Sequence, residues 1–392
     1  MKLGDICNKI GSGATPRGGK ESYKDSGTPI IRSQNVLDWS FSSDGLAYLD
    51  DDQAFALSNV EVKPRDVLLN ITGDSVARAC IVPNEFTPAR VNQHVSILRT
   101  NSRSNPVFLL AWLQTNKSLL LSLASSGATR NALTKTMLEK LDVNLPPIDV
   151  QERIAGIVLS VQSKIETNAK LNGYLADVVD GLFEKALGQA EEKTLTDVVE
   201  ILSGGTPKTK IGEYWEDGEI PFFGPGDANG STYCLTTAKC ITQLGLENCN
   251  SELYPVDTVF LTARGTVGKV AMAAKPMAMN QSCFAFRGLG VSQPAVYQII
   301  KRAVRSLKAK ANGATFAAIN TRDLKIETIL VPPDEELVAF EEEAASLHSM
   351  MRANEEESLK LSSLRDALLP KLMSGEIDVS EVDLTQLNSH LT

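Results

Sequence analysis

The feature that most constrains the fold of this chain is an internal repeat of about 190 residues. "SGATP" at residues 12–16 returns as "SGGTP" at residues 203–207, and "VNLPP" at residues 143–147 returns as "ILVPP" at residues 329–333. Similar segments that recur in the same order over so long a stretch are typical of a tandem duplication. The chain is therefore expected to fold as two similar units, each with its own hydrophobic core.

The first copy of the repeat begins close to a phosphate-binding loop, "GSGATPRGGK". A P-loop needs a glycine where this chain has Ala14 and a hydroxyl residue where it has Glu21. The second copy, "SGGTPKTKIGEY", lacks the Gly-Lys pair altogether. The copies share small-small-Thr-Pro, which predicts a tight turn. Basic residues are placed differently around this turn in the two copies, which fits either a recognition scaffold or an ordinary solvated turn.

Both halves of the chain follow one plan. Each begins with about 145 residues of short strand-like runs broken by turn residues, and ends this part with a Pro-Pro pair. Asp149 and Asp334 then stand where the N-cap of a long amphipathic helix is expected. The expected fold class is α/β (α+β), with two tandem β-rich globular domains separated by long helices. The expected boundaries are 1–148 for the first domain, 149–193 for a central helix, 194–333 for the second domain, 334–375 for a C-terminal helix, and 376–392 for a tail without assigned function.

The two long helices carry matching rows of apolar residues. Between Ile154 and Leu182 these residues alternate steps of four and three, which is the spacing of a coiled-coil seam. The row includes Asn168, and a shift of 186 residues along the chain places Asn354 at the equivalent position of the second row. The pattern predicts that the two helices pair as a coiled coil.

The two asparagines indicate how the helices pair. Asn168 is the midpoint of residues 151–185 and Asn354 is the midpoint of residues 337–371, so they would meet at the centre of an antiparallel pair. Buried amides that face each other fix register and orientation, whereas amides that turn to solvent fix neither, and the sequence leaves both open. An antiparallel pair would relate the domains by a pseudo-twofold axis and span ~52 Å at 1.5 Å per residue. That span lies between one and two turns of B-DNA at ~34–36 Å per turn.

Charge and cysteine content narrow the class of protein. The formal net charge is −9, yet residues 1–148 and 194–333 each carry +2, whereas residues 149–193 carry −3 and residues 334–392 carry −10. A balance of +2 permits contact with nucleic acid without demanding it. Six cysteines without CxxC spacing and only three histidines predict neither a zinc site nor a disulfide framework. Because no apolar run approaches ~20 residues, we expect no membrane partner and a cytoplasmic location.

These features together resemble the specificity subunit of type I restriction-modification enzymes. The likeness rests on the "SGATP" and "SGGTP" starts, on the Gly-Ala-Thr segments that lead to "LPPIDVQERI" and "VPPDEELVAF", and on the C-terminal "LLPKLMSGEI". It covers nearly the whole chain. The resemblance implies that each globular unit is a target recognition domain for one half of a split double-stranded DNA sequence.

The resemblance also implies the partners. The long helices would bind two methyltransferase (modification) subunits, with restriction/translocase subunits engaged indirectly. S-adenosylmethionine, ATP and magnesium would then be bound by partner subunits, and none by this chain. In one departure, Glu335-Glu336-Leu337 replaces the Val150-Gln151-Glu152-Arg153 type of helix start. This departure raises the question of whether the two partner-binding surfaces are equally good.

The residues themselves give little support to catalysis by this chain. "FFGPG" at residues 222–226 imitates the Phe-x-Gly-x-Gly loop of S-adenosylmethionine enzymes, but the first copy has Ile30-Ile31-Arg32-Ser33-Gln34 there. The chain has no Asn-Pro-Pro-aromatic tetrad and no convincing Ser-His-Asp or paired-carboxylate spacing. A non-catalytic DNA-binding subunit is therefore expected. The alternatives are a two-ended protein scaffold without sequence-specific DNA binding, and a nucleotide-dependent enzyme that would need Lys20.

Candidate DNA-binding residues follow from the chemistry of base edges, because Arg and Lys match guanine while Asn and Gln match adenine. The candidates on turns and strand ends are Arg17, Lys20, Arg32, Gln34, Asn35, Arg78, Asn92, Gln93 and Arg130 in the first domain, and Lys208, Lys210, Arg264, Lys269, Asn280, Gln281 and Arg322 in the second. Some of them would contact phosphates and carry no sequence information.

The repeat sorts these candidates further. Domains that read different targets should differ at their reading residues, so the shared pairs Asn92-Gln93 and Asn280-Gln281 are interpreted as structural or as contacts to the DNA backbone. The unshared stretches Arg32-Ser33-Gln34-Asn35 and Arg264-Gly265-Thr266 are the better reading candidates.

Overall fold

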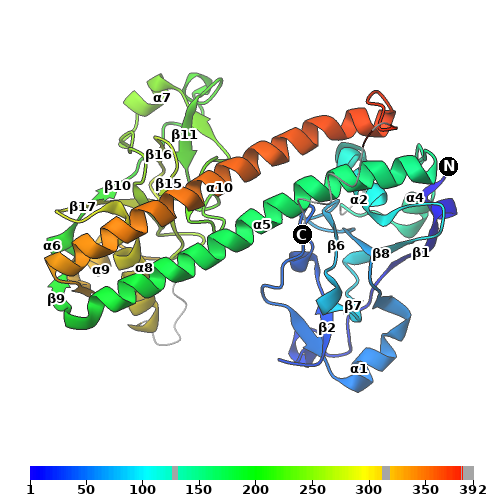
Figure 1. Ribbon diagram of the computed structural model, residues 1–392, viewed down its shortest axis with the longest axis horizontal. Helices are drawn as coiled ribbons and strands as arrows, with labels where there is room; N and C mark the ends of the chain where they lie inside the picture. The colour runs from blue at the N-terminus through cyan, green and yellow to red at the C-terminus, as the bar shows by residue number, and fades with distance from the viewer. Residues whose placement is uncertain (126–130, 311–317, 381, 383–392) are drawn as a thin grey trace. The chain divides into compact units, whose positions relative to one another are not determined.

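The computed structural model (Figure 1) describes residues 1–125, 131–310, 318–380 and 382. The chain divides into two compact units. Unit 1 comprises Met1–Ile165 and Lys360–Thr392, and unit 2 comprises Glu166–Leu359. Two long helices, α5 (Ile148–Ala186) and α10 (Asp334–Ser374), each contribute one part to unit 1 and the other to unit 2.

Unit 1 is built on two four-stranded sheets. The first has the order β1-β8-β5-β6, with bounds β1 Cys7–Ser12, β8 Val95–Thr100, β5 Val67–Asn70 and β6 Ala79–Ile81. The second has the order β3-β2-β7-β4, with bounds β3 Ala47–Leu49, β2 Thr28–Ile31, β7 Ala89–Val91 and β4 Glu61–Val62. Strands of the first sheet pair antiparallel throughout, whereas β2 and β7 of the second pair parallel.

Unit 1 also contains short helices. Their bounds are α1 Asp51–Ala56, α2 Pro106–Thr115, α3 Lys117–Ser125 and α4 Lys135–Glu139. Among the described residues, no single helix is both long and apolar enough to cross a membrane, and one bent pair, α2 with α3, meets the criterion only when joined and only by length and composition.

The core of unit 1 lies on both faces of β5. Val67 and Leu69 pack in a cluster with α2, α5 and α10, whereas Leu68 packs in a second cluster with β2 and β7. Successive side chains of a strand point to opposite faces, so an apolar run without alternation is expected where both faces are covered. The sequence "VLL" therefore places β5 at the centre of the unit.

Unit 2 repeats the first sheet. Its five-stranded sheet has the order β10-β17-β14-β15-β12, with bounds β10 Val199–Ser203, β17 Cys283–Gly288, β14 Val259–Thr262, β15 Val270–Ala273 and β12 Tyr233–Cys234. A three-stranded sheet has the order β13-β11-β16, with bounds β13 Cys240–Ile241, β11 Ile220–Phe223 and β16 Ala278–Met279. The first four strands of the larger sheet have the same order and pairing as β1-β8-β5-β6, which agrees with the duplication read from the sequence.

The remaining elements of unit 2 join the sheet to the long helices. The helices are α6 Leu195–Val198, α7 Gln243–Glu247, α8 Gln293–Lys310 and α9 Thr321–Ile326, and a two-stranded ribbon joins β9 Glu191–Thr194 to β18 Thr328–Val331. The central segment was expected over residues 149–193; its helix α5 ends at Ala186, close to the end of the 151–185 stretch, and the chain pairs with β18 from Glu191 onward. Helix α10 ends at Ser374, and Gly375 follows with a φ of 78°, the left-handed conformation common after helix ends.

The long helices pair antiparallel, as the sequence predicted, and in unit 2 Asn172 of α5 donates to the carbonyl of Met351 of α10 over 2.9 Å. In unit 1, Gln162 of α5 accepts a hydrogen bond of 2.8 Å from Arg365 of α10. In unit 2, Phe183 of α5 packs edge-on against Phe340 of α10, with ring centroids 5.1 Å apart. Higher numbers on one helix thus face lower numbers on the other. The seam residues Ile154, Val158, Asn168, Leu175 and Val179 are all buried.

Asn168 and Asn354, for which the sequence left side-chain pairing open, make no hydrogen bond between their side chains. Asn354 donates from Nδ2 to Oδ1 of Asn172 over 2.8 Å, while Asn168 donates to the carbonyl of Asn354 and to Oε2 of Glu357 over 3.3 and 2.7 Å. Helical side chains lean toward the N-terminus of their own helix. In an antiparallel pair, two equivalent side chains therefore lean past each other, and each meets a residue about one turn away.

Candidate nucleic-acid interface

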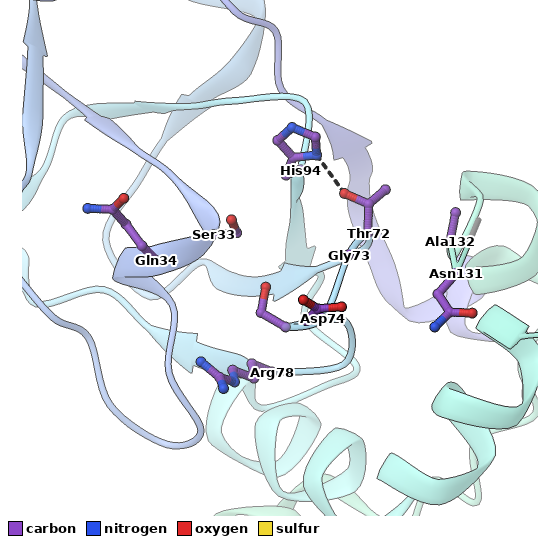
Figure 2. Close-up of a pocket in the computed structure, with 10 residues that line it drawn as sticks. Ser33, Gln34, Thr72, Gly73, Asp74, Arg78, His94, Asn131 and Ala132 are labelled. Atoms are coloured by element: carbon purple, nitrogen blue, oxygen red, sulfur yellow. Dashed lines mark hydrogen bonds between the residues drawn. The ribbon is translucent and has the colours of Figure 1, made fainter. Parts of the chain in front are cut away.

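A cleft of about 720 Å³ opens in unit 1 where several loops converge (Figure 2). We call it the unit 1 cleft. Its lining residues are Ser33, Gln34, Thr72, Gly73, Asp74, Ser75, Arg78, His94, Asn131 and Ala132. They come from the 3-10 turn Ser33–Asn35, from the loop between β5 and β6, from the turn before β8, and from the segment that precedes α4.

The loop between β5 and β6, residues 71–78, is held from beneath by Asn70. The side chain of Asn70 is buried, and its Nδ2 donates to the carbonyls of Ser33 and Val36 over 2.9 and 3.2 Å and to Oγ of Ser75 over 3.1 Å. Its backbone NH donates to the carbonyl of Arg78 over 2.8 Å, which closes the loop. One buried amide therefore fixes both the loop and the neighbouring 3-10 turn.

Unit 2 builds the same loop, residues 263–269, on a different buried residue. Thr262 is buried and occupies the place of Asn70, because its NH donates to the carbonyl of Lys269 over 2.9 Å. Its hydroxyl accepts from the NH of Lys269 over 3.0 Å and donates to the carbonyl of Thr266. The hydroxyl of Thr266 in turn donates to the carbonyl of Pro225 over 2.8 Å. Both loops are therefore fixed by polar side chains of the protein itself.

The backbone identifies equivalent positions in the two loops. Gly73 and Gly265 both have positive φ, 77° and 83°. Counting from these glycines, Thr72 is equivalent to Arg264. Counting back from the closing carbonyls, Arg78 is equivalent to Lys269. The second loop is one residue shorter, so a constant offset along the sequence does not align both ends of the loop.

His94 completes the unit 1 cleft. Its Nδ1 lies 2.6 Å from Oγ1 of Thr72, and its backbone carbonyl accepts from the NH of Ile71 over 2.9 Å. Ser282 takes the equivalent place in unit 2, where its carbonyl accepts from the NH of Ala263 over 2.8 Å. The position that carries an imidazole in unit 1 therefore carries a small hydroxyl in unit 2.

The turn with which each repeat begins packs against the shared Asn-Gln pair. A Cβ on Gly13 would lie 1.7 Å from the carbonyl oxygen of Val91, and a Cβ on Gly204 would lie 2.3 Å from that of Asn280, so only glycine fits. The hydroxyl of Thr15 donates to Oε1 of Gln93. Thr206 and Gln281 make the same hydrogen bond in unit 2. The "SGATP" and "SGGTP" segments are therefore structural turns.

Asn92 and Asn280 have structural roles. Oδ1 of Asn92 accepts from the NH of His94 over 3.0 Å, and Oδ1 of Asn280 accepts from the NH of Ser282 over 2.9 Å. Asn92 is also buried. These contacts support the structural interpretation of the shared pair, while Gln93 and Gln281 are exposed at the surface beside it.

The side chains of two first-domain candidates contact other groups of the protein. Asn35 is fully buried, and its Nδ2 donates to the carbonyls of Ser42 and Asp44 over 2.9 and 3.2 Å. This argues against a role in reading bases, because a short amide after a 3-10 turn satisfies nearby backbone groups. The half-buried Arg32 donates to the carbonyl of Gly45, and its guanidinium lies 5.4 Å from the centroid of the Tyr23 ring.

The other first-domain candidates are distributed over several elements. Gln34 and Arg78 both line the unit 1 cleft. Arg17 is exposed on the turn after Pro16. Lys20 belongs to the 3-10 turn Gly19–Ser22, and Arg130 lies outside the described residues.

In unit 2 the structure brings Arg264 and Lys269 onto one loop, and both are exposed. Lys208 and Lys210 are exposed beyond the initial turn, where the carbonyl of Lys208 accepts from Nε1 of Trp215 over 3.3 Å. Arg322 is exposed in the first turn of α9, on a separate element.

Sequence reasoning missed five polar residues of the unit 1 cleft: Thr72, Asp74, Ser75, His94 and Asn131. His94 directly follows the shared Asn-Gln pair, which was a usable signal. The match of Thr72 to Arg264 depends on a one-residue gap that only the hydrogen bonds of the loops locate. Among the described residues, no group of three or more His, Cys, Asp or Glu side chains is placed to hold a metal ion.

Comparison with known proteins agrees with this geometry. The family model for the type I restriction modification DNA specificity domain matches residues 1–175 and again residues 188–360. The HindI specificity subunit of Haemophilus influenzae is 22% identical over 409 residues, covering 81% of this chain and 87% of that protein. The putative MjaX specificity subunit of Methanocaldococcus jannaschii is 22% identical over 410 residues, covering 96% and 93%.

A solved structure shares the fold. The type I restriction-modification S subunit from M. genitalium superposes with a TM-score of 0.54 at 14% sequence identity, covering 95% of each chain. The two matches of the family model cover most of the sequence and fall one on each half of the repeat. The chain therefore belongs to the type I restriction modification DNA specificity domain family, as a specificity subunit with two DNA-recognition domains.

Proposed function

We propose that the two units read the two halves of a bipartite double-stranded DNA target, unit 1 through its cleft and unit 2 through the loop of residues 263–269. The observation that carries this proposal is the repeated loop. Buried Asn70 and Thr262 hold the same backbone path, and that path presents different polar side chains in the two units. Two domains with different targets need this combination, because base edges differ between targets while the sugar-phosphate backbone does not.

The long helices carry exposed apolar side chains that suit a protein partner. On α5, Leu171, Tyr174 and Val178 are 37%, 68% and 50% exposed. Their spacing of three and four residues puts them on one face of the helix, and such a row marks an interaction site. Two methyltransferase subunits are the partners that fit, with restriction/translocase subunits engaged indirectly.

The chemistry belongs to those partners in this proposal. They bind S-adenosylmethionine, ATP and magnesium and carry out methyl transfer and cleavage, while this chain binds no cofactor and is non-catalytic. The complex acts on cellular DNA, so its location is cytoplasmic. The acidic stretch 334–392, with a net charge of −10, is repelled by DNA and is better suited to contact protein.

The test is to co-express the chain with the methyltransferase subunit of the same system and to map methylated adenines in host DNA by single-molecule sequencing. The expected result is a bipartite motif of which one half changes when residues 1–148 are exchanged for another domain of the family. Exchange of residues 194–333 is the matched control and should change the other half. A stable complex that methylates nothing, and binds DNA without steep salt dependence, would favour a protein scaffold instead.

A further inference from the structure

The two equivalent loops contain one position that is cationic in both units and one position that is charged in only one unit. Arg78 and Lys269 are equivalent and both cationic, and each follows a residue with positive φ, Ala77 at 68° and Gly268 at 82°. Thr72 and Arg264 are also equivalent, but only one of them is charged. One position therefore keeps its chemistry in both units, and the other changes it.

A position that keeps its charge in two domains with different targets contacts something common to both targets. The phosphate backbone is common to all DNA, and Arg and Lys are its usual ligands. Arg78 and Lys269 stand at the point where each loop rejoins the sheet, directly before β6 and β15. Both are therefore suited to fix the DNA backbone against the loop.

Arg264 has the properties of a base-reading residue. Its side chain is exposed and makes no hydrogen bond or ion pair with any residue that the structure describes. Its backbone is nevertheless fixed, because its NH donates to the carbonyl of Ser282 over 3.2 Å and the next residue, Gly265, has a φ of 83°. A guanidinium held in this way on a rigid loop loses little conformational freedom on binding.

The geometry of the arginine guanidinium favours guanine over the other bases. Arginine presents two parallel donors that match O6 and N7 of guanine in the major groove, whereas adenine offers one acceptor and one donor on that edge. Thr72, the equivalent in unit 1, is a short hydroxyl engaged with Nδ1 of His94 at 2.6 Å and cannot make this contact. The two units therefore differ in base preference at an otherwise equivalent position.

We propose that Arg264 reads the guanine of a G·C pair in the half-site bound by unit 2. Lys269, like Arg78 in unit 1, binds phosphate and does not contribute to base preference. This assignment rests on the proposed function of the two units. It concerns one base pair in one half of the target.

The test compares Arg264→Ala with Lys269→Ala, two exposed residues of the same loop, in the full chain co-expressed with its methyltransferase subunit. Methylated sites are mapped genome-wide. For Arg264→Ala, discrimination at one G·C position of the unit 2 half-site should fall by about 5- to 150-fold, the value of one bidentate contact. For Lys269→Ala, methylation should fall at all sites alike, with every base preference kept and the salt slope of DNA binding reduced by about one. Arg264→Lys should behave as an intermediate, since it keeps the charge and loses the fork.

Several outcomes would overturn the assignment. The assignment is wrong if Arg264→Ala keeps every base preference, or if the unit 2 half-site of the wild-type protein contains no G·C pair. If Arg264→Ala abolishes methylation, the base preference is measured instead by binding of the purified complex to duplexes substituted at each position. A variant that still prefers guanine at the assigned position contradicts the assignment. The domain exchange described above is read on the wild-type chain, so failure of the bipartite function is distinguishable from failure of this residue.

Discussion

A buried carboxyl in unit 2 gives a quantitative prediction about stability. Glu355 of α10 lies against α5 and β12, and its Oε1 accepts from Nδ2 of Asn172 over 3.5 Å and from the NH of Tyr233 over 3.4 Å. Its Oε2 is buried without a hydrogen-bond partner among the residues that the structure describes. Burial raises the pKa of Glu355 from 4.5 to about 7, against a smaller lowering by these hydrogen bonds.

The sign of the effect follows from the two pKa values. The unfolded chain releases this proton near pH 4.5, whereas the folded protein keeps it until about pH 7. Stability is therefore lost as the pH rises from 4.5 to 7, and the loss is complete above pH 7. The full shift corresponds to about 3 kcal/mol at 1.36 kcal/mol per unit, and partial solvent access reduces this to about 2 kcal/mol.

The perturbation that tests this is Glu355→Gln, because the amide resembles the protonated carboxyl and cannot ionise. We expect the variant to be more stable than the wild type by about 2 kcal/mol at pH 8 and by well under 1 kcal/mol at pH 5. Urea unfolding at the two pH values, followed by circular dichroism, measures the difference. Glu342→Gln, at an exposed position of the same helix, is the control and should change little at either pH. A gain that is equal at both pH values, or a loss at pH 8, would refute the reasoning.

Two further predictions concern buried polar residues. Burial, with a smaller contribution from the charge of Lys301, lowers the pKa of His348 from 6.5 to about 4, so wild-type stability falls as the pH decreases through this range. His348→Gln should therefore gain stability relative to the wild type at pH 5 and not at pH 8, the reverse of Glu355→Gln, as measured by the same urea titrations. Asn70→Ala removes three hydrogen bonds beneath the loop between β5 and β6 and should cost about 1–3 kcal/mol. Its methylation activity should fall while the complex still forms on size-exclusion chromatography, and unchanged methylation would show that the loop does not depend on Asn70.

Much of the fold could be predicted because the sequence contains an internal repeat. The repeated "SGATP" and "SGGTP" segments predicted two domains, the alternating steps from Ile154 to Leu182 predicted that the long helices pair, and the matching positions of Asn168 and Asn354 indicated an antiparallel pair. The pairing of Asn354 with Asn172 could not be predicted, since seam spacing identifies the facing side of a helix and not the lean of its side chains. The end of α5 at Ala186 depended on the pairing of β9 with β18, a contact between segments far apart in the sequence.

The candidate site was predicted less well for a related reason. Residue type marks what can contact DNA, but burial decides what is available, and Asn35 and Asn92 have suitable side chains that the protein uses for its own backbone. A polar side chain beside a turn satisfies local NH and carbonyl groups whenever it can reach them. Sequence alone does not say which polar residues are left over. Arg78 and Arg264 lie on loops, as the sequence indicated, but their equivalences to Lys269 and Thr72 needed the hydrogen bonds.

Under the proposed function, the two loops suggest how the DNA target can change without a change of fold. Asn70 and Thr262 differ in identity yet close equivalent loops, because each needs only a buried polar group that reaches the loop backbone. Arg264 is exposed and its side chain makes no hydrogen bond or ion pair with the described part of the protein, so replacing it should cost little stability. Residues that fix the loop are therefore constrained by burial, and residues that read the DNA are constrained only by the target. If Arg264 reads DNA as proposed, we expect that a new specificity needs changes at the exposed positions alone, provided that the buried polar group beneath them is retained.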